Sequence, residues 1–348
     1  PWGTTDWRID PRTHRLTKAD DDAPTRFYLD NFGVGGFIEL EDTQTFCLRT
    51  GLSTEELEAL LSVGAFAPSR SANVTGEGEV DASQSGSVYI NAGQSPAMGI
   101  ETLPADTDKA SGPLHRITNM TPDRVDRMNR MIRLARWLEL PFDEVDLLLV
   151  ASMQGEQRAA QAARRVRVDA ANPWLISQNT LRALGLFQIV RRKHDVKAED
   201  FAALLYGLNV HGRGKTASQF DRVFNSQALF SIALTLDNQP FTLTPKPGDE
   251  AARQKIDHLC AALGITFETY RYLARVIEQT CAGEPLAWSR EVVSAFYRLV
   301  HLPRCVGLST IEALALLELL DDGGSRLVSM LGGPPQIASY HASSNTDT

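Results

Sequence analysis

The sequence predicts a mainly α-helical fold: an irregular stack of αα-hairpins with a small β-containing insertion and a β-hairpin or extended arm. Three observations support this prediction. A similar helix-start pattern occurs five times along the 348 residues, and an amphipathic segment with helical spacing precedes most copies. Two other stretches are strand-like or rich in Gly, Ser and Asn.

The five helix starts align on a capping position, which holds Ser53, Pro141, Lys197, Thr266 and Ser309. Ser and Thr at such a position accept hydrogen bonds from the first backbone N–H groups of a helix. Pro suits the first turn because it has no N–H to satisfy. Glu56 and Glu312, three residues after their anchors, can complete capping boxes. The residue before each anchor is apolar: Leu52, Leu140, Val196, Ile265 and Leu308.

An apolar stripe follows each helix start. Positions four, seven and eight residues after the anchor share one helical face. They are Leu57, Leu60 and Leu61; Val145, Leu148 and Leu149; Phe201, Leu204 and Leu205; Tyr270, Leu273 and Ala274; Ala313, Leu316 and Leu317. We expect every stripe to find a partner in its own hairpin. The copies are unevenly spaced, which excludes a regular solenoid.

Apolar residues at helical spacing also mark the helices that precede three of the copies. They are Val125, Met128, Met131, Ile132, Ala135 and Leu138; Ile256, Leu259, Cys260 and Leu263; Val292, Phe296, Leu299 and Val300. The repeating unit is therefore helix, tight turn, capped helix.

Two stretches interrupt the helices. In residues 71–112, the piece SGSVYINAG alternates Val88 and Ile90 with Tyr89. This region is either a long surface loop with one weak hairpin or a small inserted β-module. In residues 229–245, Phe230, Ile232, Leu234 and Leu236 alternate before turn-forming residues, which predicts a hairpin or, alternatively, an extended arm.

These patterns divide the chain into four parts. We expect a flexible N-terminal segment over 1–30, a helical domain over 31–70 and 113–320, the insertion over 71–112, and a flexible tail over 321–348. Because the chain begins with Pro1 and has a loose end, we interpret it as an excised piece of something longer.

The composition argues against several classes of function. The net charge of −8 argues against a general nucleic-acid binder. No apolar run approaches the ~18 residues of a membrane-spanning helix, and we see no signal peptide. The four cysteines lie in apolar contexts without C-x-x-C spacing, so we expect free thiols: Cys47, Cys260, Cys281 and Cys305.

Several motifs suggest chemistry but are incomplete. HGRGKT, residues 211–216, lacks the first glycine of a phosphate-binding loop, and we interpret it as a flexible inter-helix loop. GQSPA, residues 93–97, lacks the last glycine of a nucleophile elbow. No histidine lies in a metal-binding motif. We therefore predict no catalytic, cofactor or metal residues and leave any binding residues unassigned.

Five arginines recur at every third position after Asp123. At this spacing they rotate around a helix, and Asp123–Arg127 and Asp126–Arg130 form (i, i+4) pairs. We interpret them as a solvated helix face, with a polyanion site as the alternative. The arginines are Arg124, Arg127, Arg130, Arg133 and Arg136.

In combination, four segments resemble the A component of insecticidal Tc toxin complexes and the related virulence-plasmid A proteins. They are FCLRTGLSTEELEALL (46–61); SGSVYINAG with the helix pair of 123–149; NTLRALGLFQIVRRKHDVKAEDFAALLYGLN (179–209); and SQFDRVFN (218–225). They occur in a fixed order and cover most of residues 46–240.

The resemblance implies a piece of the α-helical shell that surrounds the channel of a very large, homopentameric, pore-forming translocation component. Such a component is a bacterial toxin, secreted or released at the cell surface, that delivers a toxic enzyme into target cells. The resemblance implies no catalytic residue and no membrane contact for this segment. The partners would be other copies of the full-length chain and a host receptor or glycan. The alternative function is a receptor- or glycan-binding module that uses residues 71–112. We expect the isolated chain to be monomeric or weakly associating.

Overall fold

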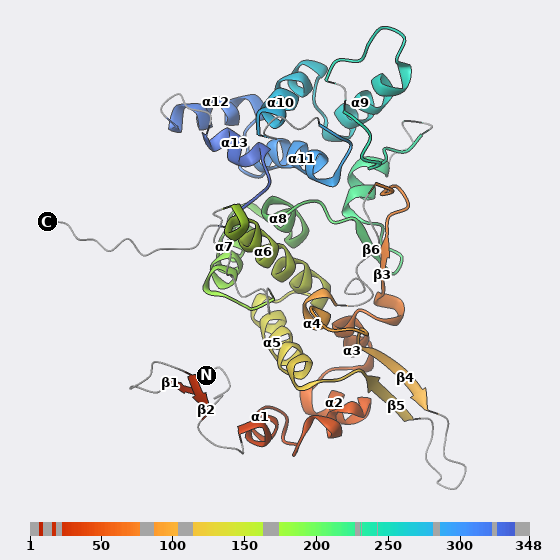
Figure 1. Cartoon of the computed structure of the whole chain (residues 1–348), viewed down its shortest axis with the longest axis vertical. Helices are drawn as coiled ribbons and strands as arrows, with labels where there is room; N and C mark the ends of the chain where they lie inside the picture. The colour runs from red at the N-terminus through yellow and green to blue at the C-terminus, as the bar shows by residue number, and fades with distance from the viewer. Residues whose placement is uncertain are drawn as a thin grey trace, which may run out of the picture. The chain divides into compact units, whose positions relative to one another are not determined.

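The computed structural model describes residues 7–9, 16–18, 23–76, 87–103, 114–162, 174–226, 230, 232–241, 243–280, 286–321 and 326–337 (Figure 1). The chain divides into two compact units. The first comprises residues 1–67 and 81–143, and the second comprises residues 68–80 and 144–348. The fold is mainly helical, as predicted, and its strands form two-stranded sheets.

The first unit is built around α5, Pro122–Leu138. Its other helices are α1 (Ala23–Phe32), η1 (Phe37–Glu41), α2 (Thr43–Thr50), α3 (Thr54–Leu61), η2 (Gly64–Phe66) and α4 (Val88–Asn91). Its strands pair antiparallel as β1 (Trp7–Ile9) with β2 (Leu16–Lys18), and as β4 (Gly99–Leu103) with β5 (Leu114–Thr118). Both α3 and α4 pack against α5.

The second unit holds the remaining elements. Its helices are α6 (Phe142–Ala162, which begins two residues before the boundary), α7 (Gln178–His194), α8 (Ala198–Leu205), the π-helical turn η4 (Asp221–Asn225), α9 (Glu250–Leu263), α10 (Phe267–Thr280), α11 (Arg290–Cys305), α12 (Thr310–Leu320) and α13 (Arg326–Gly332). Strands β3 (Pro68–Arg70) and β6 (His211–Arg213) pair antiparallel.

The helix starts form as predicted. Ser53 and Ser309 are N-caps, each completing a capping box with Glu56 or Glu312, and Thr266 accepts from the N–H of Thr269 at 3.2 Å. Four copies produce contacting helix pairs within one unit: α2 with α3, α7 with α8, α9 with α10, and α11 with α12. The copy at Pro141 lies at the boundary between the units.

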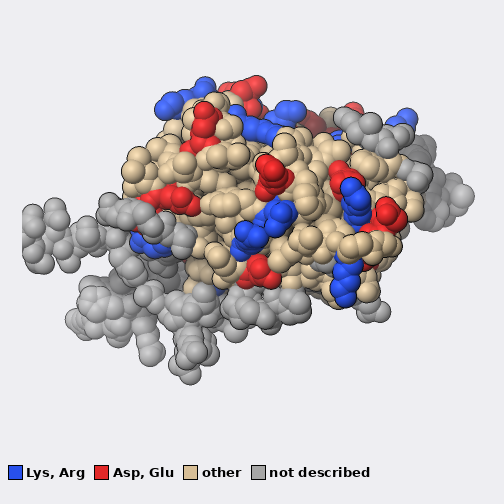
Figure 2. Space-filling view, turned by 90° about the horizontal axis from the view of Figure 1, so that it is seen from above, with Lys and Arg blue, Asp and Glu red and all other residues tan. Residues whose placement is uncertain are grey.

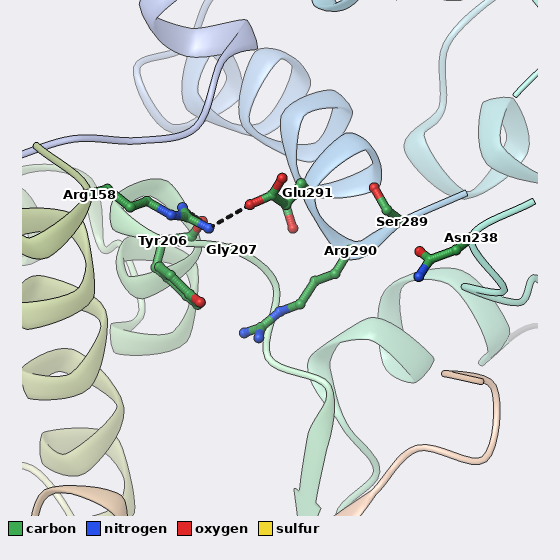
Figure 3. Close-up of a pocket in the computed structure, with 8 residues that line it drawn as sticks. Arg158, Tyr206, Gly207, Asn238, Ser289, Arg290 and Glu291 are labelled. Atoms are coloured by element: carbon green, nitrogen blue, oxygen red, sulfur yellow. Dashed lines mark hydrogen bonds and ion pairs between the residues drawn. The ribbon is translucent and has the colours of Figure 1, made fainter. Parts of the chain in front are cut away.

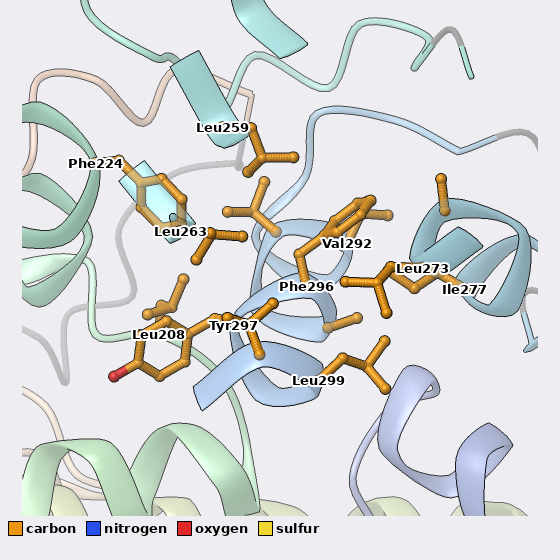
Figure 4. Packing of buried hydrophobic residues seen from close by; sticks show 14 of the residues in the cluster. Leu208, Phe224, Leu259, Leu263, Leu273, Ile277, Val292, Phe296, Tyr297 and Leu299 are labelled. Atoms are coloured by element: carbon orange, nitrogen blue, oxygen red, sulfur yellow. The ribbon is translucent and has the colours of Figure 1, made fainter. Parts of the chain in front are cut away.

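The apolar stripes are buried in α3, α6 and α10. In the second unit, α9, α10 and α11 enclose a core in which Phe296 stacks on Tyr270 at 5.7 Å between ring centroids (Figure 4). The stripe of α12 is only partly covered: Ala313 is buried and Leu317 packs against the core of the second unit, but Leu316 is 44% exposed. Helix α12 contacts α11 of its own hairpin, as expected, but Leu316 is not buried by that contact.

The segment SGSVYINAG does not form the expected strand. Ser87 caps a single helical turn, α4, whose residues Tyr89, Ile90 and Asn91 are buried. Burial on α5 places consecutive side chains inside, which an alternating strand cannot do. A β-hairpin of this region does exist, but it lies further along the chain, as β4 and β5.

The described residues of 229–245 form an extended arm and not a hairpin. Leu236 bridges Val74, and Pro240 bridges Ala287. The N–H of Leu236 donates to Asn73 at 2.8 Å, so its backbone pairs with a distant segment and not with the other half of the arm. Leu234 and Leu236 are buried, whereas Ile232 is 64% exposed.

Both ends of the chain contain packed helices where we expected loose segments. Tyr28 and Phe32 of α1 are buried. Helix α13 packs on α10 and α11, and Arg298 of α11 donates to the carbonyl of Gly333 at 2.7 Å. Residues 23–30 and 326–337 therefore belong to the folded units.

Candidate functional site

The HGRGKT motif is part of a small sheet and not the flexible loop that we expected. His211–Arg213 form β6, which pairs with β3, and Thr216 donates its N–H to the carbonyl of Arg213 at 2.9 Å. Protein groups also lie close against this segment, since a Cβ on Gly212 would lie 2.4 Å from the Thr216 carbonyl oxygen. This geometry leaves no open phosphate cradle at Gly212.

Two of the five arginines contradict the interpretation of a solvated helix face. Arg124 is 2% exposed and Arg127 is 5% exposed. Arg124 donates to the carbonyls of Gln94, Pro96 and Asn119, at 2.9, 2.7 and 2.5 Å. Arg127 donates to Tyr89 and Ala92. These arginines therefore attach residues 89–97 to α5.

The other expected pairs on α5 are present. Arg127 lies 3.1 Å from Asp123, and Arg130 lies 2.7 Å from Asp126.

Acidic and basic residues are mixed over the face of the molecule that Figure 2 presents, without a patch of one sign.

The described residues present no candidate metal site. No group of three His, Cys, Asp or Glu there could hold a metal ion. Cys47, Cys260 and Cys305 are free thiols, and Cys281 lies outside the described residues. No single described helix is long and apolar enough to cross a membrane, and only the pair α11 and α12, bent by 90°, passes that test together.

A partly buried polar network joins α8 to α11. The carboxylate of Asp200 accepts from the hydroxyl of Tyr297 at 2.7 Å and lies 3.5 Å from Nε2 of His301. Burial alone would raise the pKa of Asp200, but the hydrogen bonds from His301 and Tyr297 outweigh it and lower that pKa. This network fixes the packing of the two helices.

The second unit also contains a polar cavity of about 270 Å³ at the first turn of α11 (Figure 3). Its walls come from α6, the segment after α8, the extended arm and α11. The lining residues are Arg158, Tyr206, Gly207, Asn238, Ser289, Arg290, Glu291 and Ser294.

Two guanidinium groups share the ring of Tyr206. Cζ of Arg158 lies 4.1 Å from the ring centroid and Cζ of Arg290 lies 5.1 Å from it, which are cation–π distances. Backbone carbonyls hold both groups. Nη1 of Arg158 donates to Tyr206 at 3.1 Å, and Nε of Arg290 donates to Leu208 at 2.7 Å.

A carboxylate pairs with Arg158. Nη2 of Arg158 donates to Glu291 at 2.9 Å, the dashed contact in Figure 3. The Glu291 side chain is 64% exposed, whereas that of Arg158 is 20% exposed. Ser294 is fully buried, and its hydroxyl oxygen accepts from the N–H of Leu208 at 2.9 Å. The floor of the cavity is therefore fixed, and its acidic rim lies in solvent.

The neighbouring β3–β6 sheet carries two further arginines, Arg70 and Arg213, which lie near His211. Burial, followed by the charges of Arg290, Arg70 and Arg213, lowers the pKa of His211 to about 4. The imidazole is consequently neutral at neutral pH. Arg290 therefore lines the cavity and also contributes to the positive charge around His211 of β6.

Sequence reasoning did not identify the cavity. Its residues come from four segments that are far apart in the chain and carry no common motif. The one local signal is Ser289, which caps α11 by accepting from Val292, but a helix cap alone does not indicate a binding site.

No protein-family model matches the chain. The chain is 33% identical over 311 residues to the toxin subunit YenA1 of Yersinia entomophaga, an alignment that covers 85% of this chain and 25% of that subunit. The chain therefore spans about a quarter of the length of this relative.

Two solved structures show weaker likeness. Morganella morganii TcdA4 matches 66% of this chain and 10% of its own, with a TM-score of 0.44 and 17% identity. Yersinia pseudotuberculosis TcaA-TcaB matches 54% of this chain and 9% of its own, with a TM-score of 0.39 and 18% identity.

Proposed function

Because this chain is related to the A components of Tc toxin complexes, we propose that it forms part of the α-helical shell of a pore-forming translocation component. The complete toxin component would be secreted, assemble with copies of itself as a homopentamer, and deliver a toxic enzyme into target cells. The observation that carries the proposal is the 33% identity to a toxin subunit along 85% of the chain.

The architecture is consistent with a wall-forming and non-catalytic role. Capped αα-hairpins recur in both units. Such hairpins bury one face against a neighbour and can be extended by further hairpins, which suits a structural wall. The chemistry-bearing residues that we weighed in the described ranges act in packing: Arg124 and Arg127 attach a loop, and Asp200 joins two helices.

Electron microscopy of the full-length subunit can test this proposal. An epitope inserted between Gly214 and Lys215, in an exposed turn of the second unit, would be labelled with an antibody fragment. We expect one label per subunit on the outer wall of a closed ring. The same insertion between Val306 and Gly307, which are exposed in the turn before α12, serves as a second marker. Particles without a central channel, or labels inside that channel, would overturn the proposal.

The alternative function, receptor or glycan binding by residues 71–112, has one supporting observation. Leu103 and its partner Leu114, which lies just beyond this region, are 37% and 49% exposed at the end of the β4–β5 hairpin where residues 104–113 connect the strands. A Leu103→Ser, Leu114→Ser variant would lose binding to target cells if this hairpin contacted a receptor. Unchanged cell binding by a folded variant would show that this hairpin does not contact a receptor.

A further inference from the structure

We propose that the exposed face of α12 on one copy of the chain docks on the exposed face of α7 on a second copy, in a head-to-tail contact. This inference goes beyond the proposed function, which names no contact surface, and it rests on that function only in taking a copy of the chain as the partner. Both faces belong to the second unit.

Helix α12 has a second apolar face besides the one that packs on the core. Positions three, four and seven residues apart share one side of a helix, and on this side of α12 large apolar side chains lie in solvent. They are Leu316, Leu319 and Leu320, which are 44%, 75% and 66% exposed. Glu312 begins the same face and Glu318 flanks it, and residues 310–320 include no Lys or Arg. The face is therefore apolar with an acidic rim.

Helix α7 has a comparable face with the opposite charge. It lies on the side of the helix away from the buried Phe187, and its exposed apolar side chains are Leu181, Leu186 and Ile189, at 38%, 51% and 63%. Residues 178–194 include four Lys or Arg and no Asp or Glu. Two of these cations, Arg192 and Lys193, are exposed at the C-terminal end of the face. This face is therefore apolar with a basic rim.

Gly185 lies in the middle of the α7 face, between Leu181 and Ile189. Glycine inside a helix is less stable than alanine, and a Cβ added at Gly185 would meet nothing within 4 Å. Packing within the chain therefore does not require a glycine here. An approaching helix, in contrast, comes closer to the α7 backbone where no side chain intervenes.

The acidic rim of α12 keeps its charge in the folded chain. The carboxylate of Glu318 accepts from the neutral hydroxyl of Tyr272 at 2.8 Å, and that of Glu312 accepts from the N–H of Ser309 at 2.9 Å. Neither of these partners is a cation. Both carboxylates consequently contribute negative charge beside the exposed leucines.

The two faces match in length and in the order of their charges. Positions four residues apart run from Leu181 to Ile189 on α7 and from Glu312 to Leu320 on α12, so each face extends for about 12 Å. If the helices cross in antiparallel orientation, the basic C-terminal end of α7 meets the N-terminal end of α12, where Glu312 lies. Opposite charges at the rim of an apolar contact favour this partner and this orientation.

The contact joins unlike faces of two copies. Helix α7 contacts α8, whereas α12 contacts α11 and α13, and Figure 1 shows α7 and α12 apart within the second unit. One chain therefore does not join its own two faces. Pairing α12 with α12, or α7 with α7, would bring rims of the same charge together, which is unfavourable. A head-to-tail contact leaves one face open on each end copy and continues from copy to copy.

Two double variants of the whole chain test this contact, because each removes one face and keeps the other. Leu186→Glu with Ile189→Glu removes the α7 face, and Leu319→Glu with Leu320→Glu removes the α12 face. All four side chains are more than half exposed, so the fold should persist, which circular dichroism checks. Three large apolar side chains on each face support only a weak contact, in the high-micromolar range. By sedimentation equilibrium, each variant alone should associate at least about tenfold more weakly than the wild type.

The mixture of the two variants is the decisive sample. One variant supplies an intact α7 face and the other an intact α12 face, so the mixture should form a 1:1 dimer within about twofold of the wild-type affinity. The wild type should continue to larger species. Raising the salt concentration from about 0.05 to about 0.5 M should weaken the mixed dimer several-fold, because the rims have opposite charges. Leu48→Glu, at an exposed position on α2, is the control and should associate as the wild type does.

Three results would overturn the inference. Undiminished self-association of either double variant would show that like faces meet, and a mixture that stays monomeric would show that the two faces do not bind each other. A mixed dimer that is insensitive to salt would contradict the role of the charged rims. None of these results bears on the proposed shell, because the alignment covers 25% of the related subunit and a ring can close through other regions. Electron microscopy of the labelled full-length subunit tests that proposal separately.

Discussion

The guanidinium of Arg124 donates a hydrogen bond to the carbonyl of Pro96 at 2.7 Å, although the two residues are 28 positions apart. The same side chain also reaches the carbonyls of Gln94 and Asn119. A charged group with 2% exposure is tolerated there because backbone oxygens replace its lost water. One arginine therefore fixes the loop that precedes β4.

Arg124→Met should destabilise the first unit by about 3 kcal/mol, because three backbone carbonyls lose a charged donor at once. Arg133→Met is the matched control, since Arg133 is an exposed arginine on the same helix, and it should stay within about 0.5 kcal/mol of the wild type. Urea unfolding followed by circular dichroism measures both. Equal effects of the two variants would show that the loop contacts contribute little.

Ser53→Ala should lower the free energy of unfolding by about 0.5–2 kcal/mol. The hydroxyl of Ser53 accepts from the N–H of Glu56 at 3.1 Å, and the Glu56 carboxylate accepts from the N–H of Ser53 at 2.7 Å. Ser309→Ala removes the equivalent bond at the start of α12 and should act in the same direction. An unchanged denaturant midpoint in both variants would contradict the role of these capping boxes.

The stability of the second unit should fall as the pH drops from about 6.5 to about 4, in part because of His211. Burial, followed by Arg290, Arg70 and Arg213, lowers its pKa in the folded state to about 4, while the unfolded chain titrates near 6.5. Between these two pH values the unfolded state binds more protons than the folded state, so lowering the pH increases the population of the unfolded state. After a discount for partial exposure, the loss is on the order of 2 kcal/mol.

His211→Asn should remove this share of the pH dependence, as measured by denaturant midpoints at pH 7 and pH 4.5. His194→Asn is the control, because His194 ends α7 and lies in the same unit. If the His211 ring carbons titrate near pH 6.5 by NMR, its surroundings are not cationic.

The thiols should all be free, but unequal in reactivity. Burial, together with the charge of Asp257, raises the pKa of Cys260 to about 11, and the thiolate is the reactive form. Alkylation of the native protein near pH 8 should therefore label Cys47 before Cys260. In unreduced, denatured protein, titration should find four thiols; finding two would indicate a disulfide.

The isolated chain should be monomeric at micromolar concentration and associate weakly above it through α12. Leu319 and Leu320 are 75% and 66% exposed on this helix, an apolar surface too small for a stable dimer. Leu319→Glu with Leu320→Glu should abolish the association seen by light scattering, whereas Leu48→Glu, at an exposed position on α2, should not. A stable five-fold ring of this chain would contradict the prediction.

The sequence by itself determined the helices, because their signals are local. A cap such as Ser53 and an apolar residue four positions later act within one or two turns, so the pattern of neighbours is enough to predict them. The same local chemistry predicted the αα-hairpins and the ion pairs along α5. The family resemblance also came from the sequence, because it depends on the order of four segments.

Only the tertiary structure decided which polar groups are buried and what they contact. Arg124 and Arg133 have the same spacing and chemistry in the sequence, yet one is buried beneath a loop and the other is exposed. Val88 and Ile90 alternate like a strand, but burial against α5 made them helical. The cavity joins Arg158 to Arg290, residues 132 positions apart, and short-range patterns carry no information about such long-range contacts.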